Sequence, residues 1–368
     1  MTDAGIERRR PQGAAPPAAP SRRRPATEVS RPAEPEGRTG GLYFASEKTH
    51  LQFIHSGSTM LDCALGGGWV LGRVANIIGD KSTGKTLLAI EACANFAKAY
   101  PRGKVFFRER ESAFDKKYAE AFGLPMDRVD FGPETGAARF DTVEGFHDDL
   151  LQCIDKAKRA KQPAIYVLDS FDALSAAAEM DRKITDASYG GDRAKKMSEL
   201  FRRLIRPLED NDVLLMIISQ IRDNIGAMFG KKTKRMGGHA LDFYATHVIE
   251  LAHLGYVPKT INGVKRDTGI DVKALVSKNK VGLTHRDVEF EIQFGYGVED
   301  LTSCLDWLIE VGRIGTLGLN KDSALRFLKE TNNLPDAEYR LRVKEVTAAA
   351  KVAWREIEYE FLPKRRKY

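Results

Sequence analysis

The sequence has few cysteines and no long hydrophobic run. No apolar stretch of the 368 residues approaches the roughly 20 residues that a membrane-spanning helix needs. The Arg- and Pro-rich N-terminus has no apolar segment of the kind found in secretory signals. The cysteines are far apart, lie in apolar patterns and form no C-x-x-C pair: Cys63, Cys93, Cys153 and Cys304. These absences argue against a membrane protein and a disulfide scaffold, and they predict reduced core thiols in a cytoplasmic protein.

The first 40 residues also have almost no large apolar side chains. They contain the arginine triplets Arg8–Arg10 and Arg22–Arg24 and many prolines: Pro11, Pro16, Pro17, Pro20, Pro25, Pro32 and Pro35. Such a segment cannot bury enough surface to offset the entropy of ordering, so we predict a disordered basic tail over residues 1–40. The tail is either passive or an arm that contacts nucleic acid or a partner. The net charge of +7 is weak support for a polyanionic partner.

From about residue 41 the sequence alternates between two kinds of segment. Short apolar segments with the composition of buried strands lie at residues 74–78, 104–109, 164–169 and 213–219. Segments with helical spacing of apolar residues lie at 86–100, 112–123, 141–160 and 194–209. This alternation predicts an α/β fold with a mostly parallel central sheet covered by helices on both faces.

After residue 247 the pattern changes. THVIELAHL, DVKALVSK and DVEFEIQF are typical of consecutive strands, with Asn262-Gly263 as a turn between the first two. From about residue 300 the spacing is helical again, and the chain ends in the basic segment LPKRRKY. We therefore predict three parts: the tail at 1–40, a core at 41–300, and a small helical domain at 301–368.

The stretch IIGDKSTGKTLLAI, residues 77–90, fits the phosphate-binding P-loop at every position. An apolar strand precedes it and a helix follows, so backbone N–H groups and the helix N-terminus can surround phosphates. Lys85 is expected to reach the β- and γ-phosphates, and the Thr86 hydroxyl to bind Mg²⁺. The predicted nucleotide-binding residues are Gly79, Asp80, Lys81, Ser82, Thr83, Gly84, Lys85 and Thr86.

Carboxylates follow two of the predicted strands. Asp169 ends the strand AIYVLD and is expected on the Mg²⁺ side of the site, although it could instead cap a helix with Ser170. Glu111 follows the strand KVFFRE, where a glutamate can polarise an attacking water. Spacing alone does not choose between Glu111 and Glu109, and either could be a surface charge.

Two segments have the character of DNA-contact elements. Residues 221–239 form a Gly-rich loop with Phe229, two methionines and the basic residues Arg222, Lys231, Lys232, Lys234 and Arg235. Such a loop suits the binding of single-stranded DNA, although it could be an ordinary solvated loop. The helix at 194–209 has an apolar stripe of Met197, Phe201, Leu204 and Leu208 and a basic stripe of Lys195, Arg202 and Arg206. A charged helix face is often only solvated.

Seven segments together resemble the bacterial RecA recombinases in order and spacing. Besides the P-loop they are GSTMLDCALGGG, RERESAFDKKYA, YVLDSFDAL, SQIRDNIGAMFG, GGHALDFYA and SKNKVG. The resemblance covers roughly residues 50–300 and implies a RecA-like P-loop ATPase core. It implies that Glu111, rather than Glu109, is the catalytic glutamate, and that Asp115 and Tyr118 bracket the adenine of ATP.

The resemblance implies further roles at the subunit interface and on DNA. Gln220 matches the residue that senses the γ-phosphate, and Lys278 and Lys280 match lysines that reach the nucleotide of the neighbouring subunit. Residues that match contacts to the DNA backbone are Ser198, Arg202, Gly237 and Gly238.

The function implied is that of an ATP- and Mg²⁺-dependent recombinase. Such a protein forms a helical filament of identical subunits on single-stranded DNA and exchanges strands with homologous duplex DNA. The alternatives are a RecA-fold ring motor and a regulator that binds nucleotide and DNA without hydrolysis. Four features depart from the family: the Pro/Arg tail in place of an N-terminal helix, the basic C-terminus, the segment 175–193, and His239 in place of an asparagine.

Overall fold

The computed structural model describes the chain from Leu51 onward, with interruptions. The described residues are 51–110, 114–133, 140–175, 191–223, 233–235, 238–363 and 365. For residues 191–194, 222–223, 233–235 and 238–239 this description is limited to the backbone. The predicted disordered tail at 1–40 lies outside the described residues.

A single large sheet organises the fold. Its strand order is β12-β11-β10-β9-β3-β7-β6-β4-β5, with β8 paired to β7. The strands β3 (Val74–Gly79), β7 (Val213–Asp223), β6 (Ala164–Asp169), β4 (Lys104–Glu109) and β5 (Val129–Asp130) are mutually parallel, and β9 (His247–Ile261) joins β3 in parallel. The predicted mostly parallel sheet is confirmed.

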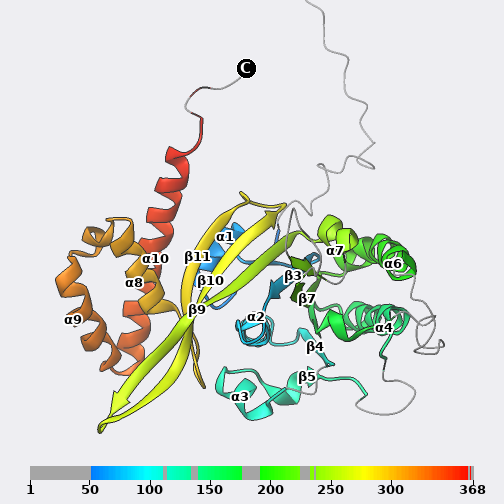
Figure 1. Cartoon of the computed structure of the whole chain (residues 1–368), viewed down its shortest axis with the longest axis horizontal. Coiled ribbons are helices and arrows are strands. Elements are labelled where there is room, and N and C mark those ends of the chain that lie inside the picture. The colour runs from blue at the N-terminus through cyan, green and yellow to red at the C-terminus, as the bar shows by residue number, and fades with distance from the viewer. Residues whose placement is uncertain are drawn as a thin grey trace, which may run out of the picture. The chain divides into compact units, whose positions relative to one another are not determined.

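Apolar side chains cover both faces of the parallel strands. On β7, Leu214 and Met216 belong to one buried cluster, and Leu215 and Ile217 to another. Helices α1 (Thr59–Leu65) and α2 (Lys85–Ala99) contribute to the first cluster. Helices α4 (Val143–Ala160), α6 (Gly191–Asp210) and α7 (Gly238–Tyr244) contribute to the second. Figure 1 shows α2 on one side of these strands and α4 and α6 on the other.

The antiparallel half of the sheet contains a long hairpin. β9 and β10 (Val264–Asn279) pair along their length, and β11 (Arg286–Gln293) and β12 (Gly297–Glu299) follow. Asn262 and Gly263 have φ values of 50° and 78°, as a tight hairpin turn requires. The predicted turn is confirmed, but both strands extend further than predicted, and the hairpin projects past the other strands (Figure 1).

The C-terminal helices pack on this antiparallel part of the sheet. α8 (Asp300–Glu310), α9 (Lys321–Asn332) and α10 (Asp336–Glu360) place Leu305, Ala324 and Val346, respectively, in the same buried cluster as Phe290 of β11. The predicted helices are present and share the core of the sheet. That residues 301–368 form a domain of their own stays a prediction.

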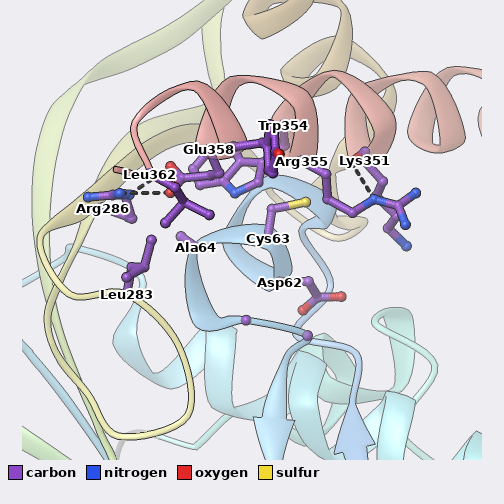
Figure 2. A pocket seen from close by; sticks show the side chains of 13 residues that line it. Asp62, Cys63, Ala64, Leu283, Arg286, Lys351, Trp354, Arg355, Glu358 and Leu362 are labelled. Carbon is purple, nitrogen blue, oxygen red and sulfur yellow. Dashed lines mark hydrogen bonds and ion pairs between the residues drawn. The ribbon is translucent and has the colours of Figure 1, made fainter. Parts of the chain in front are cut away.

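A cavity of about 610 Å³ lies where α10 crosses α1. Cys63, Trp354 and Leu362 are among its lining residues, and Figure 2 shows them facing one another across it. The guanidinium of Arg286 closes one side, because its Nε and Nη2 both donate to the Glu358 carboxylate at 2.7 Å. The cavity is lined by α1 with the two glycines after it, by α10 with Leu362, by Leu283, and by Arg286 at the start of β11; none of the P-loop residues lines it.

Two predicted segments differ from the structure. The helix predicted at 112–123 is shorter: α3 spans Lys116–Ala121, because the Asp115 carboxylate caps the N–H groups of Lys117 and Tyr118 and so begins the helix there. The segment 221–239, predicted as a loop, contains the end of β7, the strand β8 (Thr233–Arg235) and the start of α7. Antiparallel pairing of β7 with β8 turns the two ends of the loop into a hairpin.

The cysteines and helices of the structure agree with the lack of disulfide patterns and of long hydrophobic runs in the sequence. All four cysteines are free thiols, and Cys93, Cys153 and Cys304 are buried. Within the described ranges, no helix has the length and apolar character that crossing a bilayer requires.

Candidate nucleotide-binding site and DNA-contact elements

The P-loop connects β3 to α2 and is shaped by two glycines. A Cβ at Gly79 would lie 2.6 Å from the Thr83 hydroxyl oxygen and 2.8 Å from the carbonyl of Leu251. Gly84 has a φ of 83°, and a Cβ there would lie 2.6 Å from Cδ1 of Ile292. A side chain at either position would therefore collide with its surroundings. The chain forms the tight loop that phosphate binding requires.

The last two residues of the P-loop carry its chemistry. Lys85 is buried, and its ammonium group donates a hydrogen bond to the carbonyl of Asp80, inside the loop. The Thr86 hydroxyl donates to Oδ2 of Asp169 at 2.6 Å. A hydroxyl and a carboxylate oxygen in contact are the hard oxygen groups that suit Mg²⁺. The donor set at the start of α2 and the end of β6 thus fits a nucleotide with its metal ion.

The capping alternative for Asp169 and Ser170 does not hold. The short 3₁₀ helix at Phe171–Ala173 has Ser170 as its N-cap, with no side-chain capping bond. Asp169 instead lies buried at the end of β6, against Thr86. The carboxylate is therefore in contact with the P-loop threonine, and its role beside a metal ion stays a prediction.

Gln220 lies on the strand next to the P-loop. It pairs with Gly79 in the β3–β7 register, and its backbone N–H donates to Oδ2 of Asp172 at 2.6 Å. Gln220 and Asp169 line a cavity of about 560 Å³ together with residues 81–87 of the P-loop. The structure therefore brings Lys85, Thr86, Asp169 and Gln220 into one site.

The two predicted glutamate positions are placed unequally. Glu111 lies outside the described residues. Glu109 ends β4 and pairs with Asp169 across the parallel strands, so the chain leaves β4 at the same edge as the metal-side carboxylate. The catalytic role of Glu111 stays a prediction.

Asp115 and Tyr118 lie at the start of α3. Asp115 caps the helix, as described above, and is exposed to solvent. The Tyr118 hydroxyl accepts a hydrogen bond from the backbone N–H of Gly295, and burial raises the pKa of Tyr118. Gly295 follows Phe294, which lines the P-loop cavity. Tyr118 is therefore next to the nucleotide cavity, while its contact with adenine stays a prediction.

Lys278 and Lys280 bind the end of α7 in the single chain. Lys278 donates to the carbonyls of Asp242 and Phe243, the latter at 2.9 Å. Lys280 donates to the carbonyls of Phe243 at 2.9 Å and Tyr244 at 3.4 Å. Cations stabilise the last carbonyls of a helix. Burial and nearby Arg73 lower the pKa of Lys280. That these lysines reach the nucleotide of a neighbouring subunit stays a prediction.

Helix α6, which is predicted to contact DNA, has the two faces expected from its sequence. Met197, Phe201, Leu204 and Leu208 are buried. Lys195, Arg202 and Arg206 are exposed, and Ser198 is half-buried. The amphipathic pattern is confirmed, and contact of Ser198 and Arg202 with DNA stays a prediction.

The predicted DNA loop begins on the strand that carries Gln220. In the β7–β8 ladder Arg222 pairs with Lys234, and Ile221 pairs with Arg235. Lys231, Lys232 and Gly237 lie outside the described residues, and Gly238 begins α7. β7 ends at Asp223, just after Gln220 and Arg222, so the nucleotide site and the basic hairpin share one strand.

Comparison with known proteins identifies the family. Residues 39–299 match the family described as the RecA N-terminal domain. The chain belongs to the RecA family. It is 32% identical over 308 residues to Protein RecA of Streptomyces venezuelae, covering 80% of this chain and 76% of that protein. It is 31% identical over 328 residues to Protein RecA of Caulobacter sp. strain K31, covering 86% and 85%.

Membership in the RecA family confirms the resemblance found in the sequence and supports function as an ATP-dependent recombinase. The predictions missed five residues of the nucleotide cavity: Leu87, Ile218, Tyr256, Ile270 and Phe294. Tyr256 and Ile270 lie on antiparallel strands and Phe294 directly follows β11, and these strands reach the P-loop because β9 pairs with β3. An aromatic residue near a strand end was the one available signal, and it is too common to identify a site.

Proposed function

We propose that this RecA-family chain binds and hydrolyses ATP with Mg²⁺ and uses it to form filaments on single-stranded DNA. These filaments pair the bound strand with homologous duplex DNA and exchange strands. The observation that carries the proposal is the contact of Thr86 with Asp169 at 2.6 Å, one strand away from Gln220 on β7. Strand β7 continues directly into the basic β7–β8 hairpin.

In this proposal the P-loop holds the phosphates. Its backbone N–H groups and the N-terminus of α2 face the phosphate oxygens, and Lys85 leaves the Asp80 carbonyl to pair with them. Thr86 and Asp169 hold Mg²⁺, which offsets negative charge on the phosphates. Glu111 orients and polarises the attacking water.

Gln220 couples the nucleotide to DNA. Its backbone is fixed by the Asp172 carboxylate, so its side chain is the part that can respond to the γ-phosphate. A response there is passed along β7 to Arg222 and the hairpin. Arg222, Lys231, Lys232, Lys234 and Arg235 then contact the DNA backbone, with Ser198 and Arg202 of α6 and the glycines Gly237 and Gly238. Backbone contacts carry no sequence information, so base pairing alone selects the homologous partner.

The subunit interface completes the site. Lys278 and Lys280 hold α7 in the isolated chain, and in a filament they exchange these carbonyls for the phosphates of the neighbour's ATP. Hydrolysis then weakens the interface, because part of the site's charge balance comes from the adjacent subunit. The ammonium groups are already directed at partial negative charge, which supports this exchange.

The test is the ATPase rate of the full chain with and without single-stranded DNA, over a series of salt concentrations. We expect DNA to stimulate the rate and salt to weaken the stimulation, since phosphate contacts release counterions. Electron microscopy and a joint-molecule assay are run in parallel, with Lys85→Ala as the control that lacks the phosphate ligand. A wild-type chain that forms neither filaments nor joint molecules contradicts the proposal, and closed rings would point to a ring motor.

A further inference from the structure

An apolar row crosses three strands beside the P-loop. Tyr256 on β9 pairs with Ile270 on β10, and Ile270 pairs with Ile292 on β11. Directly paired residues of an antiparallel sheet point to the same face, so these side chains form one continuous surface. Ile292 is the residue that a Cβ at Gly84 would meet at 2.6 Å. The row therefore lies against the P-loop, and Tyr256 and Ile270 line its cavity.

A β-bulge places Tyr256 on this face. In the β9–β10 ladder His253 pairs with Val272 and Gly255 with Asp271, which leaves Leu254 as an extra residue. In a regular strand Leu254 and Tyr256 would share a face, because side chains alternate. Leu254 instead lines a separate cavity with Asp271 and Lys273. Bulges redirect side chains next to functional sites, and this one turns Tyr256 toward the nucleotide cavity.

The chemistry of the row differs from that of the P-loop. Lys81 and Lys85 supply the cations of the cavity, whereas the row adds Tyr256 and Ile270 to its lining, and Ile292 is buried against the P-loop. Tyr256 is 58% exposed, and the centroids of the Tyr256 and His253 rings lie 4.7 Å apart in a T-shaped arrangement. An exposed aromatic ring on an apolar surface suits the base and ribose of a nucleotide better than its phosphates.

We propose that Tyr256 contacts the nucleoside part of bound ATP and that the β9–β10 hairpin is thereby a wall of the nucleotide site. The inference rests on the proposed binding of ATP at the P-loop. Phe294 lines the same cavity, and the adjacent Gly295 binds the Tyr118 hydroxyl. The nucleoside therefore lies among aromatic rings that come from α3, β9 and the end of β11.

The test measures the dissociation constants of ATP and ADP by titration calorimetry, with Mg²⁺ and without DNA. Tyr256→Ala is expected to raise both constants about fivefold to tenfold, the effect of losing one stacked ring. Tyr256→Phe keeps the ring and is expected to stay within about twofold of the wild type. Leu254→Ala is the matched control, because Leu254 is similarly exposed on the same strand but lines the other cavity.

Unchanged ATP and ADP affinities in Tyr256→Ala overturn the inference. A loss confined to ATP also overturns it, because ADP has the same nucleoside and lacks only the γ-phosphate. A second readout does not depend on affinity: ADP should quench the emission of a Tyr256→Trp variant and leave that of a Leu254→Trp variant unchanged. If the wild type binds ATP but makes no filaments, the proposed function fails while these measurements still decide the role of Tyr256.

Discussion

At the scale of single residues, the site is set by side chains whose surroundings leave them little freedom. Thr86 and Asp169 meet at 2.6 Å, and Lys85 is buried inside the loop that it serves. Glu111 is the one proposed catalytic group outside the described residues. Its neighbour in the same segment, Glu109, ends a strand beside Asp169, so the two glutamates can be compared directly.

Glu111→Gln should separate binding from turnover. The amide keeps the size of the side chain but cannot polarise water, so we expect ATP affinity within about twofold and a turnover at least about 100-fold lower. ATP binding and DNA-stimulated hydrolysis are measured on the same preparation. Glu109→Gln is the matched control and should keep most of its activity. If Glu109→Gln loses turnover and Glu111→Gln does not, the assignment of the catalytic glutamate is reversed.

Glu91 on α2 should make stability depend on pH. Burial raises the pKa of its carboxyl to about 7, and the nearby backbone N–H of Val298 only partly offsets this. The folded state therefore favours the protonated carboxyl. The stabilisation that the protonated Glu91 gives the folded protein is complete below the pKa of the unfolded state and is lost as pH rises through about 7. Glu91→Gln removes this dependence. In urea unfolding, we expect the free energy of unfolding of Glu91→Gln minus that of the wild type to increase by about 2 kcal/mol between pH 5.5 and 8.5.

The matched control for Glu91 is a glutamate without burial. Glu120→Gln, at an exposed position of α3, should follow the wild-type pH profile. Parallel profiles for Glu91→Gln and the wild type would show that the Glu91 carboxyl is ionised throughout this range in the folded protein.

At the scale of elements, the sequence predicted what depends on local pattern. The four parallel strands and the helices between them follow from apolar runs and helical spacing. The turn follows from the pair Asn262-Gly263, because these residue types accept the positive φ angles that the structure has there. The start of α3 was wrong because Asp115 caps it, and a capping choice is settled by geometry. Tyr256 was missed because its face depends on the bulge at Leu254, which only the pairing of β9 with β10 reveals.

The Arg286–Glu358 pair should hold α10 against the sheet. Both nitrogens of the fork donate at 2.7 Å, and both side chains are largely sheltered from solvent. Arg286→Met keeps the apolar part of the side chain and removes the charge, and we expect it to lower the free energy of unfolding by about 1–2 kcal/mol. Arg342→Met is the control, since Arg342 pairs with Glu345 at 3.4 Å on the exposed face of α10. Equal effects of the two variants would contradict a special role for the fork.

At the scale of the whole molecule, the P-loop and the basic lysines lie on different parts of one chain. Lys85 begins α2, whereas Lys278 and Lys280 lie at and just after the end of β10 and bind the end of α7. The sequence resemblance predicted their meeting across a subunit interface. No property of the isolated chain could predict this meeting, because in the isolated chain both ammonium groups donate to carbonyls of α7. The prediction therefore has to be tested on assemblies.

Mixing two inactive variants should restore part of the activity. Lys85→Ala disables the P-loop half of every site, and Lys280→Met disables the neighbour's half. In a mixed filament, a site between the intact P-loop of one variant and the intact Lys280 of the other is complete. Random mixing in equal amounts makes such sites about a quarter of the total, so we expect DNA-dependent ATPase near a quarter of the wild-type rate.

The control replaces Lys280→Met with Lys265→Met. Lys265 is an exposed lysine nearer the tip of the hairpin, and this variant should be active without mixing. If the mixture of Lys85→Ala and Lys280→Met stays as inactive as its components, the lysine does not act across the interface. If Lys280→Met alone is fully active, the site is complete within one subunit.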